Sequence, residues 1–211
     1  KMKDTSLIIT TQGNRDMLLN RAITSAKLNN FEEIIIIGPR SVSEVANYFE
    51  VEHIICDGTT AHKYNKGLAK AGCEYTMFLN DDDFYLTIPN VFGEPNTFTY
   101  TDCYVERDGV IIKRICKPKI LEKGNYIHYL TVRAKTDLLR NEKFDESVMY
   151  LEDYEMWLRL KSKGVPMRYI PVCFAVYNDC EATDRKSKST ELLKELKEVR
   201  RKYCNDKQKE V

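Results

Sequence analysis

Three consecutive acidic residues, Asp81, Asp82 and Asp83, follow an apolar run that ends at Leu79. Closely spaced carboxylates can hold a hard divalent cation, and Mg²⁺ is usually bound by few carboxylates together with substrate phosphates. Adjacent acids also repel one another, and a bound Mg²⁺ or Mn²⁺ would offset that repulsion. By itself such a triplet is more often a solvated acidic turn, so its meaning depends on the elements that position it.

Glu152 and Asp153 form a second acidic pair, at the start of an amphipathic stretch that runs to Leu160. A carboxylate in this place could take a proton from a hydroxyl nucleophile, provided that it lies within hydrogen-bond reach of the substrate. The helix dipole also favours acids in a first turn, so a structural role is the alternative. The spacing leaves both interpretations open.

The elements that position the triplet alternate between strand and helix patterns. The run Glu33–Gly38 is apolar almost without interruption, which is typical of a strand covered on both faces of a parallel sheet. We predict strands over residues 6–11, 33–38, 53–56 and 74–79, and helices around residues 18–26, 43–48 and 64–71. This order predicts a doubly wound α/β unit, in which ligands bind at the carboxyl ends of the strands. The acidic triplet lies at such an end.

The second half of the chain has a different pattern. Residues 97–106 and 110–116 alternate around Asp108-Gly109, a dipeptide typical of a hairpin turn. We predict a strand and a short helix over 125–139, a helix over 147–163, a strand over 167–177, and a charged helix with an apolar stripe over 190–202, before a polar tail predicted to be disordered. The predicted fold class is α/β with a central mixed sheet flanked by helices, and we expect one domain over residues 1–211.

The composition excludes several classes of protein. The 33 Lys and Arg residues balance 32 Asp and Glu, and a net charge of +1 argues against binding of nucleic acid through phosphate neutralisation. The apolar runs, such as residues 34–37, are all far shorter than the roughly 20 residues of a membrane-spanning helix. The seven Cys contain no Cys-x-x-Cys pair, which indicates reduced thiols and a cytoplasmic location. The sequence also lacks P-loop and dinucleotide-binding glycine motifs.

Five segments carry motifs in a characteristic order. They are Leu7-Ile-Ile-Thr-Thr-Gln-Gly-Asn-Arg15, Glu33–Gly38, Tyr64-Asn-Lys-Gly-Leu-Ala69, Phe78-Leu-Asn-Asp-Asp-Asp83, and Phe144-Asp-Glu-Ser followed by Leu151-Glu-Asp153 and Trp157-Leu-Arg159. Together they resemble the GT-A glycosyltransferases, especially the inverting family 2 group, over about residues 5–180. The resemblance implies the GT-A (nucleotide-diphospho-sugar transferase) fold, with a donor-binding half over about 1–84, an acceptor-side half over about 85–182 and a C-terminal helix over about 188–204.

Carried over position by position, the resemblance implies a role for each matching residue. Asp83 would ligate Mn²⁺ or Mg²⁺ with Asp81 as a second ligand, and Asp82 would lie near the donor sugar. Asp153 would be the base for the acceptor hydroxyl, with Glu152 as a helper. The other residues expected to bind the UDP-sugar are Thr11, Gln12, Arg15, Asp57, Lys63, Asn65 and Lys66, the two lysines through the diphosphate.

Two departures from the family pattern bear on these roles. Gly38-Pro39 replaces the acidic pair that commonly contacts uracil, which is why Asp57 is the candidate for base recognition. The His commonly found after the last strand is missing near Tyr177, so either Asp179 substitutes for it or the metal has one ligand fewer. Whether transfer inverts or retains the anomeric configuration therefore stays open.

The resemblance implies a metal-dependent glycosyltransferase that moves a hexose or deoxyhexose from a UDP-sugar to a hydroxyl of a glycan acceptor. The length is also similar to that of the amino-terminal domain of multidomain glycosyltransferases encoded by chlorella viruses. That similarity implies glycan synthesis on a capsid glycoprotein in the host cytoplasm, and further domains of the same polypeptide. The alternatives are a sugar nucleotidyltransferase, which would need a Gly-rich N-terminal phosphate loop, and a non-catalytic nucleotide-sugar-binding domain of a larger protein.

Overall fold

The first half of the chain alternates strands and helices, as the sequence predicts. The computed structural model describes residues 2–93, 97–107, 109–179 and 189–204. Four parallel strands come first: β1 (Thr5–Thr10), β2 (Glu33–Gly38), β3 (Glu52–Ile55) and β4 (Tyr75–Asn80). The helices between them are α1 (Asp16–Leu28), α2 (Ser43–Tyr48) and α3 (Thr60–Lys70). The expected doubly wound α/β unit is confirmed.

The second half adds mostly antiparallel strands. They are β5 (Phe84–Tyr85), β6 (Phe98–Arg107), β7 (Val110–Arg114), β8 (Arg133–Lys135) and β9 (Arg168–Asn178). The expected hairpin is confirmed as the antiparallel pair β6 and β7, whereas β9 runs parallel to β6. Within the described residues nine strands form one mixed sheet, in the order β3-β2-β1-β4-β8-β6-β9-β5 with β7 beside β6.

Among the described residues of the second half, the α-helices are α4 (Thr136–Glu142), α5 (Glu152–Ser162) and α7 (Ser189–Cys204). The helix expected over 147–163 was placed too early, because it begins only at Glu152. Before it, Asp145 accepts hydrogen bonds from the backbone N–H and the hydroxyl of Ser147, at 3.0 and 2.6 Å, and this side-chain turn competes with helix formation. Helix α7 confirms the helix expected over 190–202, and the tail after it lies outside the described residues.

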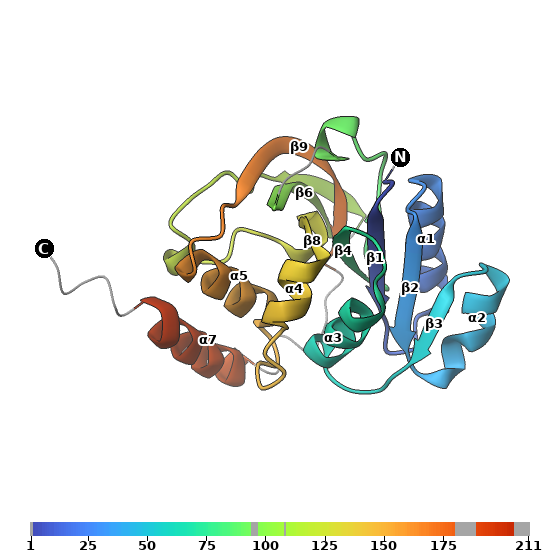
Figure 1. Cartoon of the computed structure of the whole chain (residues 1–211), viewed down its shortest axis with the longest axis horizontal. Helices are drawn as coiled ribbons and strands as arrows, with labels where there is room; N and C mark the ends of the chain where they lie inside the picture. Colours follow the sequence, from blue (N-terminus) through green and yellow to red (C-terminus); the bar gives the residue numbers. More distant parts are fainter. Residues whose placement is uncertain (1, 94–96, 108, 180–188, 205–211) are drawn as a thin grey trace, which may run out of the picture.

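Helices cover both faces of the parallel part of the sheet. The crossings from β1 to β2 and from β3 to β4 run in opposite directions, and right-handed connections then place α1 and α3 on opposite faces (Figure 1). All six residues of β1 are buried as a result. Helix α3 lies so close to β1 that a Cβ atom at Gly67 would come within 2.5 Å of Ile8 Cγ2. The carboxyl ends of β1 and β4 lie side by side, with Thr10 opposite Asn80.

A cluster of aromatic side chains joins the two halves. The Tyr64 ring of α3 lies 4.7 Å from the Phe78 ring of β4 and 5.1 Å from the Phe144 ring, measured between centroids. Trp157 of α5 is fully buried, and its indole N–H donates to the Ile127 carbonyl at 3.2 Å. Trp157 is therefore a core residue with a satisfied donor. This packing holds α3 and β4 against the second half of the chain.

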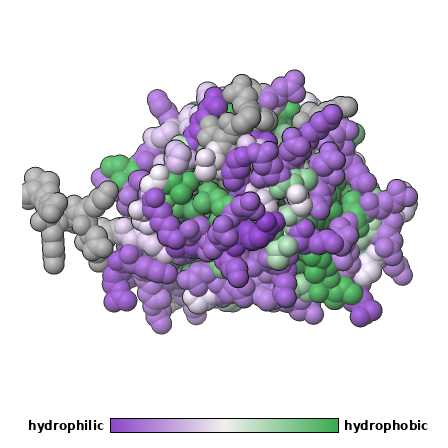
Figure 2. Space-filling view, in the orientation of Figure 1, coloured by the Kyte–Doolittle hydropathy of each residue, from purple (hydrophilic) through white to green (hydrophobic). Residues whose placement is uncertain are grey.

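Hydrophilic residues cover most of the face drawn in Figure 2, and hydrophobic residues form separate patches between them. The edge strand β7 is exposed along its length, including Val110, Ile111 and Ile112. Among the described residues, no helix has the length and apolar character needed to cross a membrane.

Candidate active site

The carboxyl ends of β1 and β4 form one wall of a small hollow, which we call the strand-end pocket. Its volume is about 110 Å³. It is lined by Thr10, Thr11, Gln12, Arg15, Thr60, Lys63, Asn80, Asp81 and Asp82. Six of these residues were expected from the sequence to contact the donor or the metal: Thr11, Gln12, Arg15, Lys63, Asp81 and Asp82. The fold thus brings them together at the edge of the sheet where α/β proteins bind ligands.

A second hollow, the α5 pocket, adjoins the first, because Thr60 and Asn80 line both. It has a volume of about 360 Å³, and Asn125, Glu152 and Asp153 lie in its wall. A larger hollow of about 570 Å³ lies at the amino ends of β2 and β3. Parallel sheets do not usually bind ligands at that edge, so we place the candidate site in the two adjoining pockets.

Asp81 is held by the loop that follows β1. Thr11 Oγ1 donates to Asp81 Oδ2 at 2.6 Å, and the Asp81 backbone N–H donates to the Thr10 carbonyl at 3.0 Å. Arg15 Nη1 lies 3.8 Å from Asp81 Oδ1. Burial raises the pKa of Asp81, the hydrogen bond from Thr11 opposes that shift, and the charge of Asp82 adds to it. The pocket therefore contains a carboxylate whose negative charge is only partly compensated.

Two arginines near the start of the chain hold Asp82. Arg15 forms an ion pair with the Asp82 carboxylate, and Arg21 Nη2 donates to the Asp82 carbonyl at 2.9 Å. The Arg21 guanidinium also lies over the Phe84 ring, 4.3 Å from its centroid. Arg21 does not stand out in the sequence, because one basic residue within a helix is typical of a solvated helix face. The contact between Arg21 and Asp82 forms because α1 packs close to the end of β4 in the folded chain.

Asp83 is fully buried and does not line the strand-end pocket. The Asn178 backbone N–H donates to Asp83 Oδ1 at 2.9 Å, and the Tyr129 hydroxyl donates to Oδ2. Burial raises the pKa of Asp83 well above its ordinary value, and the charge of Asp82 raises it further. Asn80 Nδ2 donates in turn to the Tyr129 hydroxyl at 2.7 Å. A chain of hydrogen bonds therefore links the boundary between the two pockets to Asp83.

Lys63 of α3 supplies buried positive charge beside these acids. It is 1% exposed, and its Nζ donates to the Thr11 carbonyl at 2.7 Å and to Gln12 Oε1 at 3.1 Å. Burial lowers the pKa of Lys63, whereas nearby negative groups, including Asp57, act in the opposite direction. Asp57 itself is exposed on the loop after β3. The Lys63 ammonium group therefore lies at the end of β1. Among the described residues that line the strand-end pocket, Lys63 is the one lysine.

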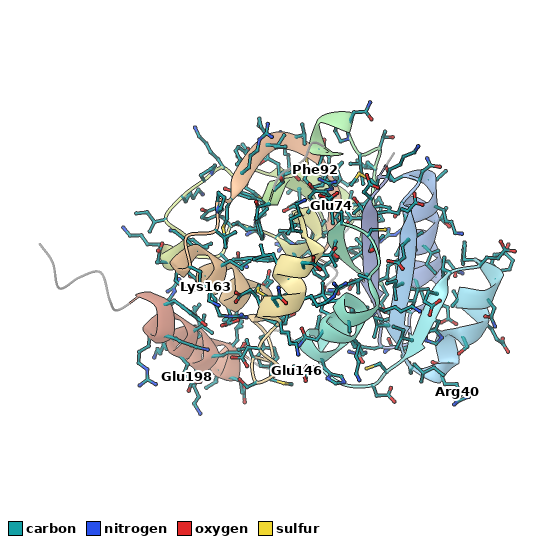
Figure 3. The ribbon with its side chains drawn as sticks, viewed as in Figure 1. Arg40, Glu74, Phe92, Glu146, Lys163 and Glu198 are labelled. Atoms are coloured by element: carbon teal, nitrogen blue, oxygen red, sulfur yellow. The ribbon has the colours of Figure 1, made fainter. Side chains whose placement is uncertain are left out.

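The structure places Asn65, Lys66 and Asp179 elsewhere. Asn65 Nδ2 donates to Glu146 Oε1 at 2.9 Å, which ties α3 to the loop before α5. Lys66 is exposed, and with Asn65 and Glu146 (labelled in Figure 3) it lines a separate hollow of about 140 Å³. Asp179, the candidate substitute for the missing His, pairs with Arg107. None of these residues lines the strand-end pocket or the α5 pocket.

Glu152 and Asp153 are the first residues of α5, and both line the α5 pocket. Asn125 Nδ2 donates to Asp153 Oδ2 at 3.1 Å. Tyr64 shows how near the two acidic groups lie. Its pKa is raised well above the usual range, first by burial and then by the charges of Glu152, Asp83 and Asp153. The acids at the end of β4 and at the start of α5 therefore both act electrostatically on one buried side chain, which neither motif could reveal alone.

The acidic triplet can be tested for its fit to a metal ion. Within the described residues no three His, Cys, Asp or Glu side chains form a complete metal site. A cation shared with a diphosphate does not need one, because Mg²⁺ takes only one or two carboxylates in such sites. Asp81 lines the pocket, and Asp83 keeps acceptor positions beyond the two used by Tyr129 and Asn178. Burial raises the pKa of both acids because it disfavours their ionised form, and a nearby cation would offset that cost, so Asp81 and Asp83 stay the candidates for holding a divalent ion.

The fold is GT-A-like. The structure is similar to that of S. aureus TarS, with a TM-score of 0.66 at 13% sequence identity, over 82% of this chain and 36% of TarS. A TarS structure of residues 1–349 in complex with UDP-GlcNAc gives a TM-score of 0.65 at 14% identity, over 82% of this chain and 58% of that one. Likeness at these identities shows the fold alone, and it confirms the expected α/β fold class.

Curated relatives of the chain are glycosyltransferases. It is 27% identical over 216 residues to the Escherichia coli UDP-Glc:alpha-D-GlcNAc-diphosphoundecaprenol beta-1,3-glucosyltransferase WfaP, covering 92% of this chain and 84% of WfaP. It is 28% identical over 207 residues to the Campylobacter jejuni GalNAc(5)-diNAcBac-PP-undecaprenol beta-1,3-glucosyltransferase, covering 83% of this chain and 65% of that protein. No family model matches the chain. These relatives belong to the class of enzyme that the sequence motifs resemble.

Proposed function

We propose that this chain is a metal-dependent glycosyltransferase that moves a hexose or deoxyhexose from a UDP-sugar to a hydroxyl of a glycan acceptor. One observation carries the proposal: the strand-end pocket with its acids shares Thr60 and Asn80 with the α5 pocket, which contains Asp153. Donor and acceptor must meet at a common boundary for transfer, and these pockets have one. The GT-A-like fold and the names of the relatives support the same class.

The donor diphosphate is proposed to bind in the strand-end pocket. Asp81 and Asp83 would hold Mn²⁺ or Mg²⁺, which when bound supplies positive charge to the departing diphosphate. Arg15 and Lys63 add positive charge from the chain itself. Asp82 lines the same pocket and is held by Arg15, which supports its proposed place near the donor sugar.

Thr11, Gln12 and Asp57 are the proposed contacts of the nucleoside. Support for Thr11 and Gln12 comes from their place in the strand-end pocket, and Asp57 lies near enough to raise the pKa of Lys63. Asn65 and Lys66 stay predictions with less support, because they line a different hollow.

Asp153 is the proposed base of the reaction. Its carboxylate would take the proton of the acceptor hydroxyl while that oxygen forms a bond to the sugar and the bond to the diphosphate breaks. Asn125 orients Asp153 Oδ2, and Glu152 lies beside it as a further acceptor contact.

The acceptor is proposed as a class only. The relatives are named for glycans on a lipid diphosphate, whereas the resemblance to viral glycosyltransferases implies a capsid glycoprotein modified in the cytoplasm. Both present a sugar hydroxyl. We also propose the division into a donor half over about 1–84, an acceptor half over about 85–182 and a C-terminal helix over about 188–204, within a polypeptide that has further domains.

A panel of UDP-sugars with Mn²⁺, scored for UDP release with and without glycan acceptors of both kinds, tests the proposal. We expect release from at least one donor, loss of release on chelation, and recovery when Mn²⁺ is restored. Asp81→Ala and Asp83→Ala should abolish cation-dependent UDP binding in calorimetry, whereas Asp137→Ala, on the exposed surface of α4, should not. UDP binding without release would indicate a binding domain. Pyrophosphate release from UTP and a sugar 1-phosphate would indicate a nucleotidyltransferase.

A further inference from the structure

One carboxylate of the C-terminal helix accepts hydrogen bonds from three consecutive backbone N–H groups. Glu195 Oε2 accepts from Met149 at 2.8 Å, and Glu195 Oε1 accepts from Tyr150 and Leu151, both at 2.9 Å. These three residues lead directly into α5, which opens with the acidic pair of the α5 pocket. Glu195 therefore contacts the segment that carries the proposed base.

This contact reaches the N-cap residue of α5, Leu151, and the two residues before it. The first N–H groups of a helix have no partner within the helix, and a side chain at the N-cap position commonly satisfies one of them. The N-cap of α5 is Leu151, whose side chain forms no capping hydrogen bond. A charged acceptor makes stronger hydrogen bonds to N–H groups than a neutral one. Glu195 thus stabilises the entry to α5 from a different helix.

Helix α7 is firmly attached to the wall of the α5 pocket. Val199 is buried, the Tyr203 hydroxyl donates to Glu155 of α5, and Arg200 Nη2 donates to the Lys123 carbonyl at 2.8 Å. Figure 1 shows α7 beside α5. Leu192, one turn before Glu195, lines the α5 pocket itself. The helix therefore contributes Leu192 to the pocket wall and holds the segment that leads into α5.

We propose that α7 is a working part of the acceptor site and that Glu195 is a positioning residue, which holds segment 149–151 and through it the Asp153 carboxylate. The inference rests on the proposed function, because that function makes Asp153 the base. Glu195 touches no reacting atom. Its effect follows from geometry: a base must lie within about 3 Å of the hydroxyl that it deprotonates, and a displacement of about 1 Å can cost on the order of 100-fold in rate.

Two substitutions and one matched control test the inference. Glu195→Ala removes all three acceptors, whereas Glu195→Gln can keep the two bonds of Oε1 but presents an amide NH₂ that cannot accept from Met149. Glu198→Ala, at an exposed residue of the same helix (labelled in Figure 3), is the control. We expect kcat to fall roughly 10- to 100-fold in Glu195→Ala, less in Glu195→Gln, and not in Glu198→Ala, with UDP affinity unchanged in all three.

Amide hydrogen exchange separates this role from a general loss of stability. The N–H groups of residues 149–151 should exchange faster in Glu195→Ala than in Glu198→Ala, while those of β1 and β4 stay protected in both. Faster exchange with unchanged kcat and acceptor KM would overturn the positioning role although the proposed function stands. Unchanged exchange would overturn the clamp itself. A wild-type chain that binds UDP and Mn²⁺ but transfers no sugar would overturn both the proposed function and this inference.

Discussion

Asn125 Nδ2 donates a hydrogen bond to Asp153 Oδ2 at 3.1 Å, although 28 positions separate the two residues in the chain. Asn125 is itself held, because its Oδ1 accepts from the Ile127 N–H at 3.1 Å and its carbonyl accepts from Arg114 Nη2 at 3.3 Å. The pair holds the Asp153 carboxylate in one orientation in the wall of the α5 pocket. This geometry leads to two predictions, one for the proposed base and one for the residue that orients it.

Asp153→Asn keeps the shape of the side chain but removes its ability to take a proton. We expect transfer to fall by roughly 10²- to 10⁴-fold, the range typical of a general base, with UDP affinity unchanged. Kinetics with a glycan acceptor and calorimetry with Mn²⁺ and UDP measure the two quantities. Turnover near that of the wild type would mean that Asp153 is only a favourable acid in the first turn of α5.

Asn125→Ala should lower kcat in the same direction but by a smaller factor, about tenfold, because Asp153 keeps its charge and loses one orienting hydrogen bond. The double variant Asn125→Ala with Asp153→Asn should be no slower than Asp153→Asn alone. Additive losses in this double-mutant cycle would show that Asn125 acts by another route. Asn47→Ala, at an exposed position of α2, is the matched control.

Lys63→Met retains the length of a buried side chain and removes its charge. We expect the affinity for UDP to fall about tenfold, because one charged hydrogen-bond donor is worth about 1.5 kcal/mol. Lys70→Met, on the exposed part of α3 where Lys70 pairs with Glu52, is the control. Lys66→Met is informative in the same assay. A loss equal to that of Lys63→Met would show that Lys66 reaches the diphosphate from its separate hollow.

Because Asp83 is buried, we expect the free energy of unfolding of the metal-free protein to depend on pH. Burial raises the pKa of Asp83 in the folded chain well above 3.8, the ordinary value that applies to the unfolded chain. At a pH between 3.8 and the raised pKa, the folded chain therefore holds a proton that the unfolded chain has lost. The free energy of unfolding therefore falls as the pH rises from 3.8 through the raised pKa. The Asp83→Asn variant has no carboxyl group at this position, so its free energy of unfolding does not fall in this way. Relative to the wild type, its stability should rise with pH by about 1.4 kcal/mol for each unit by which the pKa of Asp83 is raised. Urea unfolding across the pH range measures it, and parallel curves would contradict the prediction.

Gly67→Ala should destabilise the fold, although alanine is the better helix former. The added Cβ would lie 2.5 Å from Ile8 Cγ2 in a fully buried strand, so α3 or β1 must shift. We expect a loss of about 1–3 kcal/mol in the free energy of unfolding. Gly124→Ala meets no atom within 4 Å and should change stability by less than about 0.5 kcal/mol. Equal stabilities of the two variants would mean that α3 moves without cost.

Much of the fold follows from local patterns in the sequence. The run Glu33–Gly38 is a parallel strand because continuous apolar residues suit burial on both faces. β6 and β7 pair as antiparallel strands on either side of the position where the sequence predicts a hairpin turn. The start of α5 was placed five residues early, because the side chain of Asp145 forms a turn that competes with the helix. Periodicity alone does not register such a competing hydrogen bond.

By itself the sequence determined most of the strands and helices, though not the start of α5, and it placed the two acidic groups after the strand that ends at Asn80 and within the predicted helix over 147–163, because hydrophobic periodicity and turn residues act locally. Only the tertiary structure decided that Asp81 lines the pocket while Asp83 is buried against Tyr129, 46 residues away. It also decided that Glu195 holds the segment before α5, across 44 to 46 residues. Such contacts depend on how whole elements pack against one another, and no local pattern encodes that packing.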